Sequence, residues 1–286
     1  MIDGARWYED TGLVFADMTR GGVHGVADDG TSRVLIAHRK GIGGLVAHAA
    51  GGFVVSGRNV AHKAVDGEGG PTTVLLETAD DEVFFNDLGV DDRGRVFVGS
   101  VAHDPLGGGE GLRAAGRLYC LGLDGAAEVV ADDVLASNGI GIDPGATVLY
   151  HVDSGRRTVW SYRLDDHPHV SSRAAFAETS AYDGVPDGLA VAADGSVWVA
   201  MAGGGVVVGW DARGAVVAEI DVPQPMVTAL AFGGEGHRTL YVTTAPDDHR
   251  GGAGGPDGSV YVVPAPAPGS PGLRAAVPLG AHHRVL

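Results

Sequence analysis

The 286-residue sequence is poor in cysteine and in positive charge. Its single cysteine, Cys120, has no second cysteine with which to form an internal disulfide, so a disulfide-stapled fold is excluded. The chain has 20 Lys and Arg residues against 36 Asp and Glu residues, and its formal net charge is −16. Phosphate binding needs clustered basic side chains, so this balance argues against a nucleic-acid partner.

Long apolar segments are also missing. No run approaches the ~18 apolar residues needed to cross a bilayer. The start, Met1–Gly4, lacks the basic region and apolar core of a secretory signal. We therefore expect a cytoplasmic protein with no membrane partner. Cys120 lies inside the strand-like stretch 117–121 and is expected to be a buried, unreactive thiol.

Short β-rich runs and 48 glycines fill the sequence instead. Asp-Gly reversals such as Asp194-Gly195 separate the runs, and they favour β-hairpins because the turn needs positive φ. No segment has an apolar stripe with a 3.6-residue period, so little helix is expected. The clearest predicted strands are 13–16, 52–55, 95–99, 147–152, 196–200 and 239–243.

Six turns made of small residues or of Asn and Asp precede these strands at a steady interval. They lie at or near Asp3, Gly43, Asn86, Asn138, Asp187 and Thr228. The steps between them are 40, 43, 52, 49 and 41 residues. A repeat of this length with several strands per unit is typical of a β-propeller, whereas a β-sandwich or jelly roll would not repeat at blade length. The sequence therefore predicts an all-β fold: one six-bladed β-propeller domain over residues 1–286, with a Pro- and Gly-rich closing segment and tail over about 264–286.

Four of the six turns carry an oxygen-bearing side chain, namely Asp3, Asn86, Asn138 and Asp187. Equivalent positions of propeller blades meet at the central channel, so these side chains can converge on one metal ion. Two carboxylates and two amide carbonyls are hard donors, which favour Ca²⁺, Mg²⁺ or Mn²⁺ over a closed Zn²⁺ site. Taken singly, an Asn or Asp before Gly is an ordinary turn residue. The metal site therefore depends on the shared register and on the resemblance described next.

These residues resemble the regucalcin–gluconolactonase family, which includes senescence marker protein, gluconolactonase and luciferin-regenerating enzyme. The likeness runs from Asp3 to about Gly269, and it is carried by the order and spacing of several motifs. They are Asn86-Asp87 followed by DDRGRVFVG at 91–99, Ser137-Asn138-Gly139-Ile140, Val185-Pro186-Asp187-Gly188, AFGG at 231–234 and LYVTTA at 240–245. The resemblance implies a six-bladed propeller with one divalent cation in its central channel. Calcium is the first expectation, with manganese, magnesium or zinc as alternatives.

Family roles can be carried over position by position. Asn138 and Asp187 fall on two metal ligands, and Asp3 falls where the family usually has Glu in a Glu-Gly-Pro-x-Trp motif. Asn86 falls on an Asn that contacts the substrate or coordinates the metal. Members that act on sugar lactones often have an Arg two residues before this Asn, where this chain has Phe84. The change adds apolar surface and implies a substrate less polar than an aldonolactone.

Other residues have less direct assignments. Asp104 lies near an acidic residue with which some members bind substrate hydroxyls. His151 is expected to be a strand residue rather than a ligand, and the closing stretch 282–284 is expected to be a mobile tail. Members commonly have several residues before the first acidic ligand, and here there are two. A missing segment there would leave one blade incompletely closed.

The predicted function is metal-dependent hydrolysis of a small-molecule lactone or related cyclic ester. The metal would polarise the carbonyl, and Asp187 would activate water as a general base or, alternatively, attack as a nucleophile. Two other functions stay open: phosphotriester hydrolysis of the diisopropylfluorophosphatase-like type, and a non-catalytic calcium-binding, regulatory or scaffold propeller. The choice between a monomer and a small homo-oligomer also stays open.

Overall fold

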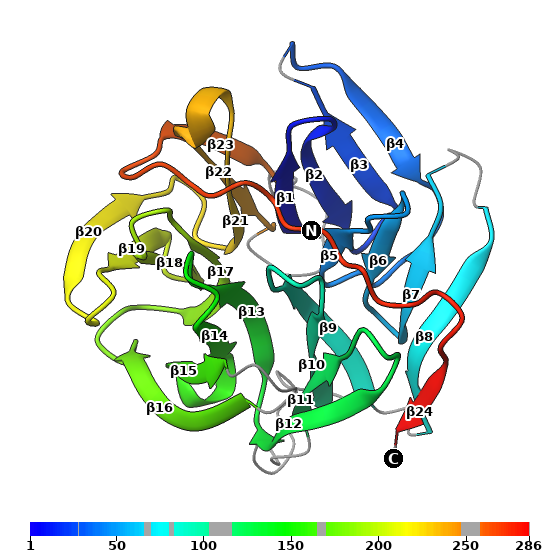
Figure 1. Ribbon diagram of the computed structural model, residues 1–286. Helices are drawn as coiled ribbons and strands as arrows, with labels where there is room; N and C mark the ends of the chain where they lie inside the picture. Colours follow the sequence, from blue (N-terminus) through cyan, green and yellow to red (C-terminus); the bar gives the residue numbers. More distant parts are fainter. Residues whose placement is uncertain are drawn as a thin grey trace.

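Six small β-sheets pack radially around a central axis in the computed structural model (Figure 1). We call the space along this axis, inside the innermost strands, the channel. The structure describes residues 1–27, 29–65, 70–79, 83–102, 116–164, 170–246 and 258–285. Within these ranges the helical elements are two short 3₁₀ turns, η1 (Ser154–Arg156) and η2 (Glu235–His237). Neither they nor any other described segment forms a helix that is long and apolar enough to cross a membrane. The predicted six-bladed β-propeller with little helix is confirmed.

The blades follow one another along the chain, and each is an antiparallel meander that runs outward from the channel. Blade 1 contains β1 (Ile2–Tyr8), β2 (Gly12–Asp17), β3 (Val23–Val26) and β4 (Ser32–Ile36). Blade 2 contains β5 (Leu45–Ala47), β6 (Phe53–Val55), β7 (Asn59–Lys63) and β8 (Thr72–Thr78), with β24 (His283–Val285) added at its outer edge. Blade 3 contains β9 (Val83–Val90), β10 (Val96–Ala102), β11 (Gly116–Leu121) and β12 (Ala127–Val134).

The second half of the chain forms the other three blades. Blade 4 contains β13 (Ser137–Ile142), β14 (Val148–Asp153), β15 (Thr158–Leu164) and β16 (Val170–Glu178). Blade 5 contains β17 (Val185–Val191), β18 (Val197–Ala202), β19 (Val206–Trp210) and β20 (Val216–Asp221). Blade 6 contains β21 (Val227–Gly233), β22 (Thr239–Thr244) and β23 (Val260–Pro264) among the described residues.

The hydrophobic core is divided into clusters that lie between neighbouring blades. Between blades 4 and 5, for example, Tyr150 and Val152 pack with Val199 and Met201. Burial of such aliphatic and aromatic faces is worth roughly 25 cal/mol per Å² of apolar surface, so blade-to-blade packing is the main force that closes the ring. The ring closes where β1 packs beside β21, and there the Thr228 hydroxyl donates a hydrogen bond of 2.7 Å to the Ile2 carbonyl.

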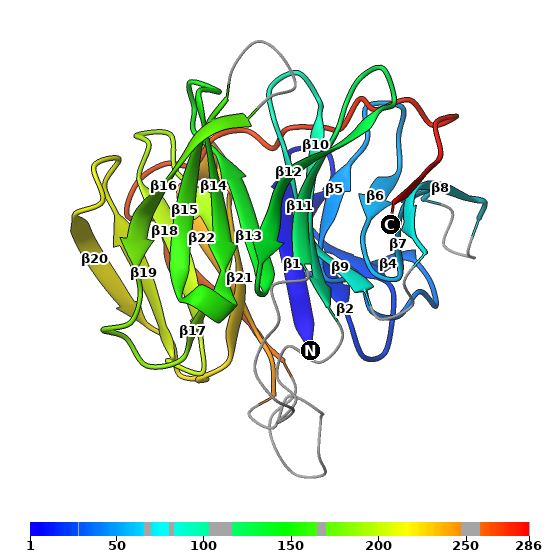
Figure 2. The ribbon, with the colours of Figure 1, turned by 90° about the horizontal axis from the view of Figure 1, so that it is seen from below.

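The innermost strands β1, β5, β9, β13, β17 and β21 give the channel two different ends (Figure 2). Their first residues, with the N-terminus of the chain, lie at the end that we call the entrance end. Their last residues lie at the opposite end, which a C-terminal segment crosses. We call that segment, residues 265–282, the strap, and its end of the channel the strap end.

The strap joins blade 6 to blade 2 across the channel. The Gly269 N–H donates to the His237 carbonyl (2.9 Å), and the Ala275 N–H donates to the Ala47 carbonyl (2.8 Å). Beyond the strap, β24 pairs in parallel with β8. The Pro- and Gly-rich closing segment is therefore irregular, as predicted, but the mobile tail predicted at 282–284 is wrong because His283–Val285 is hydrogen-bonded to a blade edge.

Candidate metal centre

The innermost strands are irregular at the predicted ligand positions. The strand pairing shifts register between Asp3 and Arg6 in β1, at Asn86-Asp87 in β9, between Ser137 and Ile140 in β13, and between Pro186 and Leu189 in β17. A β-bulge of this kind places an extra residue in one strand and re-aims its side chain. The predicted turns are therefore wrong: the four candidates lie in or beside bulges inside strands, and the bulges direct them toward the channel.

Glycine follows three of the four candidates, and Gly4 after Asp3 has a φ of 61°. The other two, Gly139 and Gly188, stand where neighbouring strands come very close. A Cβ at Gly139 would lie 2.7 Å from the Asp187 carbonyl oxygen, and a Cβ at Gly188 would lie 2.6 Å from the Thr228 carbonyl oxygen. Neither glycine has a positive φ. These Asn-Gly and Asp-Gly pairs therefore mark close contact between blades and not hairpin turns.

The equivalent positions of blades 2 and 6 are Gly43 and Thr228. A Cβ at Gly43 would lie 2.2 Å from Asn86 Oδ1, so the side chain of blade 3 occupies the space of a blade 2 side chain. Thr228 is buried, and its hydroxyl binds the Ile2 carbonyl and the Thr243 hydroxyl (3.0 Å).

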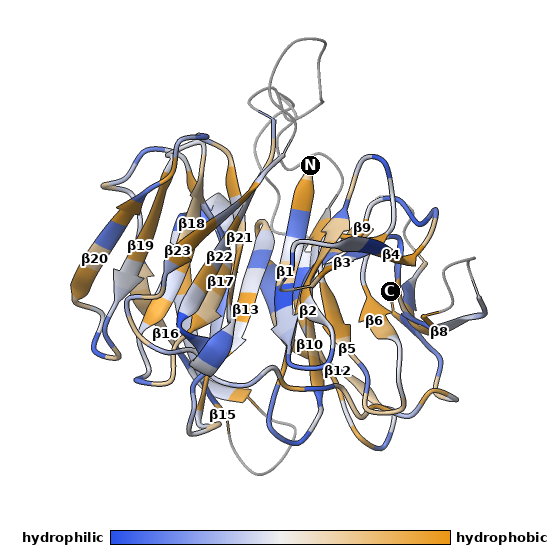
Figure 3. Ribbon diagram, turned by 90° about the horizontal axis from the view of Figure 1, so that it is seen from above, coloured by the Kyte–Doolittle hydropathy of each residue, from blue (hydrophilic) through white to orange (hydrophobic). Residues whose placement is uncertain are grey.

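A chain of hydrogen bonds links three of the four candidates. Asn86 Nδ2 donates to Asn138 Oδ1 (3.2 Å) and to the Ser137 carbonyl (2.9 Å). The Asn138 amide in turn donates to the Asp187 carboxylate and to Ser154 Oγ (3.2 Å). Asp3 lies close enough for its charge to act on Asp187. The structure thus brings together all four residues, from blades 1, 3, 4 and 5. Figure 3 shows hydrophilic stretches within the innermost strands β1 and β13.

The buried carboxyl groups of Asp3 and Asp187 both have a raised pKa. Burial and the nearby charge of Asp87 raise the pKa of Asp3 to about 7. Burial, followed by the charges of Asp3 and Asp87, raises the pKa of Asp187 well above its usual range, and the hydrogen bond from Asn138 opposes this shift. Neither Asp3 nor Asp187 forms a salt bridge with a basic side chain of the described residues. A group of carboxylates in this state is stabilised by protons or by a bound cation.

The donor set fits a hard divalent cation. It offers the carboxylates of Asp3 and Asp187 and the amide oxygens of Asn86 and Asn138, all oxygen donors of the kind that Ca²⁺, Mg²⁺ and Mn²⁺ prefer. The ranges that the structure describes contain no cluster of three or more His, Cys, Asp and Glu side chains suited to a metal. The candidate donor set therefore includes amide oxygens as well as carboxylates.

Sequence reasoning missed an ion pair beside the candidate centre. Arg6 Nη2 donates to Asp87 Oδ1 (3.2 Å) and to the Leu88 carbonyl, and Arg6 Nη1 donates to the Ala5 carbonyl (2.9 Å). Burial raises the pKa of Asp87, and the charge of Arg6 is the first effect that opposes the rise. The only sequence signal was that opposite charges lie within two recognised motifs, Asp3-Gly4-Ala5-Arg6-Trp7 and Asn86-Asp87.

The entrance rim is partly apolar. Phe84 is half-buried at the start of β9, and a Cβ at Gly41 would lie 3.6 Å from its ring. On the opposite side of the propeller, Met1 and Val185 pack with Met226, which precedes β21. Phe84 thus lies at the entrance end, as the candidate substrate contact requires. Asp104 lies outside the described residues.

Two residues that were set aside as structural are buried. Cys120 is 1 % exposed, and burial raises the pKa of its thiol to about 12, which makes it unreactive. His151 lies in β14, as predicted, and its Nε2 is 2.7 Å from the Ser137 hydroxyl. Its Nδ1 is buried without a hydrogen-bond partner among the described residues, and burial lowers the pKa of the ring to about 4.

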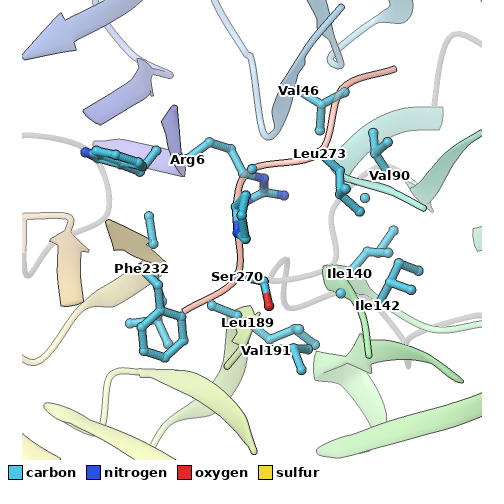
Figure 4. A pocket seen from close by; sticks show the side chains of 18 of the residues that line it. Arg6, Val46, Val90, Ile140, Ile142, Leu189, Val191, Phe232, Ser270 and Leu273 are labelled. Carbon is cyan, nitrogen blue, oxygen red and sulfur yellow. The ribbon is translucent and has the colours of Figure 1, made fainter. Parts of the chain in front are cut away.

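A cavity of about 160 Å³ lies at the strap end, away from the candidate ligands (Figure 4). Its wall consists largely of aliphatic side chains from the last residues of the innermost strands, including Ile140, Ile142 and Leu189, together with Leu273 of the strap. Arg6 is its charged side chain and points into it from β1. The strap end therefore offers apolar packing, and the oxygen donors stand at the entrance end.

Fold and site together define a class of protein: a six-bladed propeller whose channel holds a small set of buried oxygen donors. A family model described as the SMP-30/Gluconolactonase/LRE-like region matches residues 2–246, so the chain belongs to this family. The resemblance predicted from the motifs is confirmed.

Relatives of the chain include named lactonases, which hydrolyse ester bonds. It is 32 % identical to the pentonolactonase XacC of Haloferax volcanii, over 97 % of this chain and 95 % of that protein. It is 32 % identical to a 6-deoxy-6-sulfogluconolactonase of Pseudomonas putida, over 82 % of this chain and 80 % of that protein. Among solved structures, a luciferin-regenerating enzyme superposes with a TM-score of 0.84 at 24 % identity, over 96 % of this chain and 94 % of that one, which supports the fold.

Proposed function

We propose that this protein is a divalent-metal-dependent lactonase. The observation that carries the proposal is the convergence of Asp3, Asn86, Asn138 and Asp187 at the entrance end of the channel in a member of this family. Relatives that match nearly the whole chain or most of it are named for the hydrolysis of sugar lactones, which supports a cyclic ester as substrate.

The same four residues are those that would hold the cation. When bound there, the cation would polarise the lactone carbonyl and stabilise the negative charge that develops on its oxygen. Asn138 has a double role in the proposal, because it offers an oxygen and also donates a hydrogen bond that orients Asp187. The Asn86 amide, held by the Ser137 carbonyl, keeps the Asn138 oxygen in place.

Asp187 is the proposed general base. Its buried position raises its affinity for a proton, which suits it to accept one from water. The water oxygen then bonds to the lactone carbonyl carbon, the ring C–O bond breaks, and the proton passes to the released alkoxide oxygen. Attack by Asp187 itself as a nucleophile is the alternative: its carboxylate oxygen would bond to the carbonyl carbon, the ring C–O bond would break to release the alkoxide, and water would then hydrolyse the resulting anhydride. Labelled water oxygen found in the Asp187 carboxylate after a single turnover would indicate this route, because the general-base route labels only the product.

The substrate is proposed to be less polar than an aldonolactone. Phe84 and the Met1–Val185–Met226 group give the rim apolar surface. The cytoplasmic location, the identity of calcium as the metal, and the monomeric or small homo-oligomeric state stay predictions from the sequence.

Metal removal tests the proposed function. Chelator-treated protein should lose lactone turnover and regain it with Ca²⁺ or Mn²⁺. Calcium at 100 times its Kd should stabilise the fold by about 3 kcal/mol, measured by thermal unfolding. Stabilisation by calcium with no turnover on a panel of lactones would instead indicate a non-catalytic cation-binding propeller. Lactone turnover that survives complete chelation would contradict the proposal.

A further inference from the structure

Arg6 reaches from blade 1 to blade 3. It is part of β1, three residues after Asp3, yet its guanidinium binds the Asp87 carboxylate and the Leu88 carbonyl of β9. Its side chain is 19 % exposed and that of Asp87 is 6 % exposed, so the pair is largely shielded from water. A charge-assisted pair of this kind is stronger and more directional than a surface salt bridge.

The contact exists because blade 2 has no side chain between blades 1 and 3 at this level. Its innermost strand β5 has three residues and is preceded by Gly43 and Gly44. A Cβ at Gly44 would lie 2.5 Å from Asp87 Oδ1. The blade 2 backbone therefore packs against the bulge at Asn86-Asp87 without a side chain, which lets Arg6 reach the Asp87 carboxylate from blade 1.

Asp87 connects this contact to the candidate metal centre. Its carboxylate also accepts hydrogen bonds from the Leu88 and Ile140 backbone N–H groups, so it joins β9 to β13. The residue before it, Asn86, is a candidate ligand. An Asp87 side chain released from Arg6 would therefore disturb the bulge that carries Asn86, and with it the shape of the centre.

We propose that Arg6 is a positioning residue of the metal centre: by binding the Asp87 carboxylate and the Leu88 carbonyl, it fixes the bulge that presents Asn86. This inference rests on the proposed function. It assigns Arg6 no contact with the substrate. It places Arg6 among the partners that orient metal ligands, whose loss typically costs about 10- to 100-fold in metal affinity or activity.

Blade 3 offers a matched control for a purely structural role. Arg95 and Asp91 form another buried pair in the same blade, at the strap end, with Arg95 Nε 2.6 Å from Asp91 Oδ2 and exposures of 8 % and 1 %. If Arg6 serves only to stabilise the blade, Arg6→Met and Arg95→Met should behave alike. If Arg6 positions the centre, only Arg6→Met should weaken cation binding.

The experiment is calorimetric titration of chelator-treated full-length protein with Ca²⁺, with lactone kinetics measured in parallel. Arg6→Met is expected to weaken Ca²⁺ binding about 10- to 100-fold, and Arg95→Met to leave it within about twofold of wild type. Arg6→Lys keeps the charge but lacks the planar fork, so it should give an intermediate loss. Equal losses in Arg6→Met and Arg95→Met, or none in Arg6→Met, would overturn the inference.

A double-variant comparison distinguishes an effect on the centre from a general loss of folding. Asp87→Asn and the double variant Arg6→Met with Asp87→Asn remove the paired charges one at a time and together. The double variant should lose less Ca²⁺ affinity than the product of the two single losses, because no uncompensated charge remains. If the loss of Ca²⁺ affinity in the double variant equals the product of the two single losses, the inference is wrong. Wild-type protein that binds no Ca²⁺ and opens no lactone would refute the proposed function itself, a different outcome from a wild type that binds and an Arg6→Met variant that binds equally well.

Discussion

The two ends of the channel are built from the same innermost strands but have opposite chemistry. In β13 the sequence changes from Ser137-Asn138-Gly139 at the entrance end to Ile140 and Ile142 at the strap end, and β17 changes from Asp187 to Leu189 and Val191. The entrance end has bulges, buried carboxylates and amides, whereas the strap end has regular pairing, aliphatic packing and a covering segment. The innermost strands thus supply the candidate ligands from their first residues and apolar packing from their last residues.

The largest predicted effect is a loss of catalysis on substitution at the entrance end but not at the strap end. Asp187→Asn should lower lactone turnover by about 10²- to 10⁴-fold, because it removes the proposed base while keeping the side-chain shape. Steady-state kinetics with added Ca²⁺ would measure it. Asp211→Asn, in the exposed hairpin between β19 and β20 at the strap end, is the control and should keep wild-type turnover. Full turnover in Asp187→Asn that still binds Ca²⁺ would exclude Asp187 as the base.

Stability at acidic pH should depend on a histidine that is not a candidate ligand. Burial lowers the pKa of His151 to about 4, so between pH 6.5 and 4 the unfolded chain binds a proton that the folded protein does not. The contribution of neutral His151 is complete above pH 6.5 and is lost as the pH falls, up to about 3 kcal/mol. Urea unfolding across this range should show a smaller fall in His151→Gln than in wild type. Since the carboxylates are common to both proteins, equal pH profiles would contradict the prediction.

The strap end should be sensitive in stability but not in catalysis. A Cβ at Gly269 would lie 2.0 Å from Phe232 Cβ, so Gly269→Ala should push the strap off blade 6 and cost about 1 to 3 kcal/mol of unfolding free energy. Gly280→Ala, where a Cβ meets no atom within 4 Å, is the matched control. Denaturant unfolding measures the first effect, and kcat/KM should stay at the wild-type value in both variants. A large loss of kcat/KM in Gly269→Ala at a temperature where it is folded would show that the two ends are coupled.

The smallest predicted effect concerns selectivity at the entrance rim. Phe84→Arg adds hydrogen-bond donors beside the centre and should shift the kcat/KM ratio of polyhydroxylated to apolar lactones by about tenfold, the value of roughly 1.4 kcal/mol. Val262→Arg, which adds the same charge on an exposed position of blade 6, should leave the ratio unchanged. An unchanged ratio in Phe84→Arg would remove this position from the determinants of specificity.

The sequence predicted the features that repeat and missed those that depend on distant contacts. The blade-length spacing was enough to predict the fold and to bring Asn86, Asn138 and Asp187 into one channel. The same residues were assigned to turns, because an Asp-Gly pair looks locally like a hairpin. The close approach of Gly188 to Thr228, from the next blade, is what explains it.

Two other features had almost no signal in the sequence. The last residues join β8, about 200 positions away, and the basic stretch 282–284 gives no sign of a strand partner. Arg6 meets Asp87 across 81 positions only because blade 2 has glycines at this level. Both depend on what a neighbouring blade leaves open, which is a property of the assembled ring and not of any one repeat.

A crystal structure grown with Mn²⁺, located by its anomalous scattering, tests the central claim most directly. The account predicts a single ion at the entrance end, coordinated by carboxylate oxygens of Asp3 and Asp187 and by amide oxygens of Asn86 and Asn138. An ion bound elsewhere, or these four side chains turned away from it at saturating Mn²⁺, would contradict the metal centre and the lactonase proposal built on it.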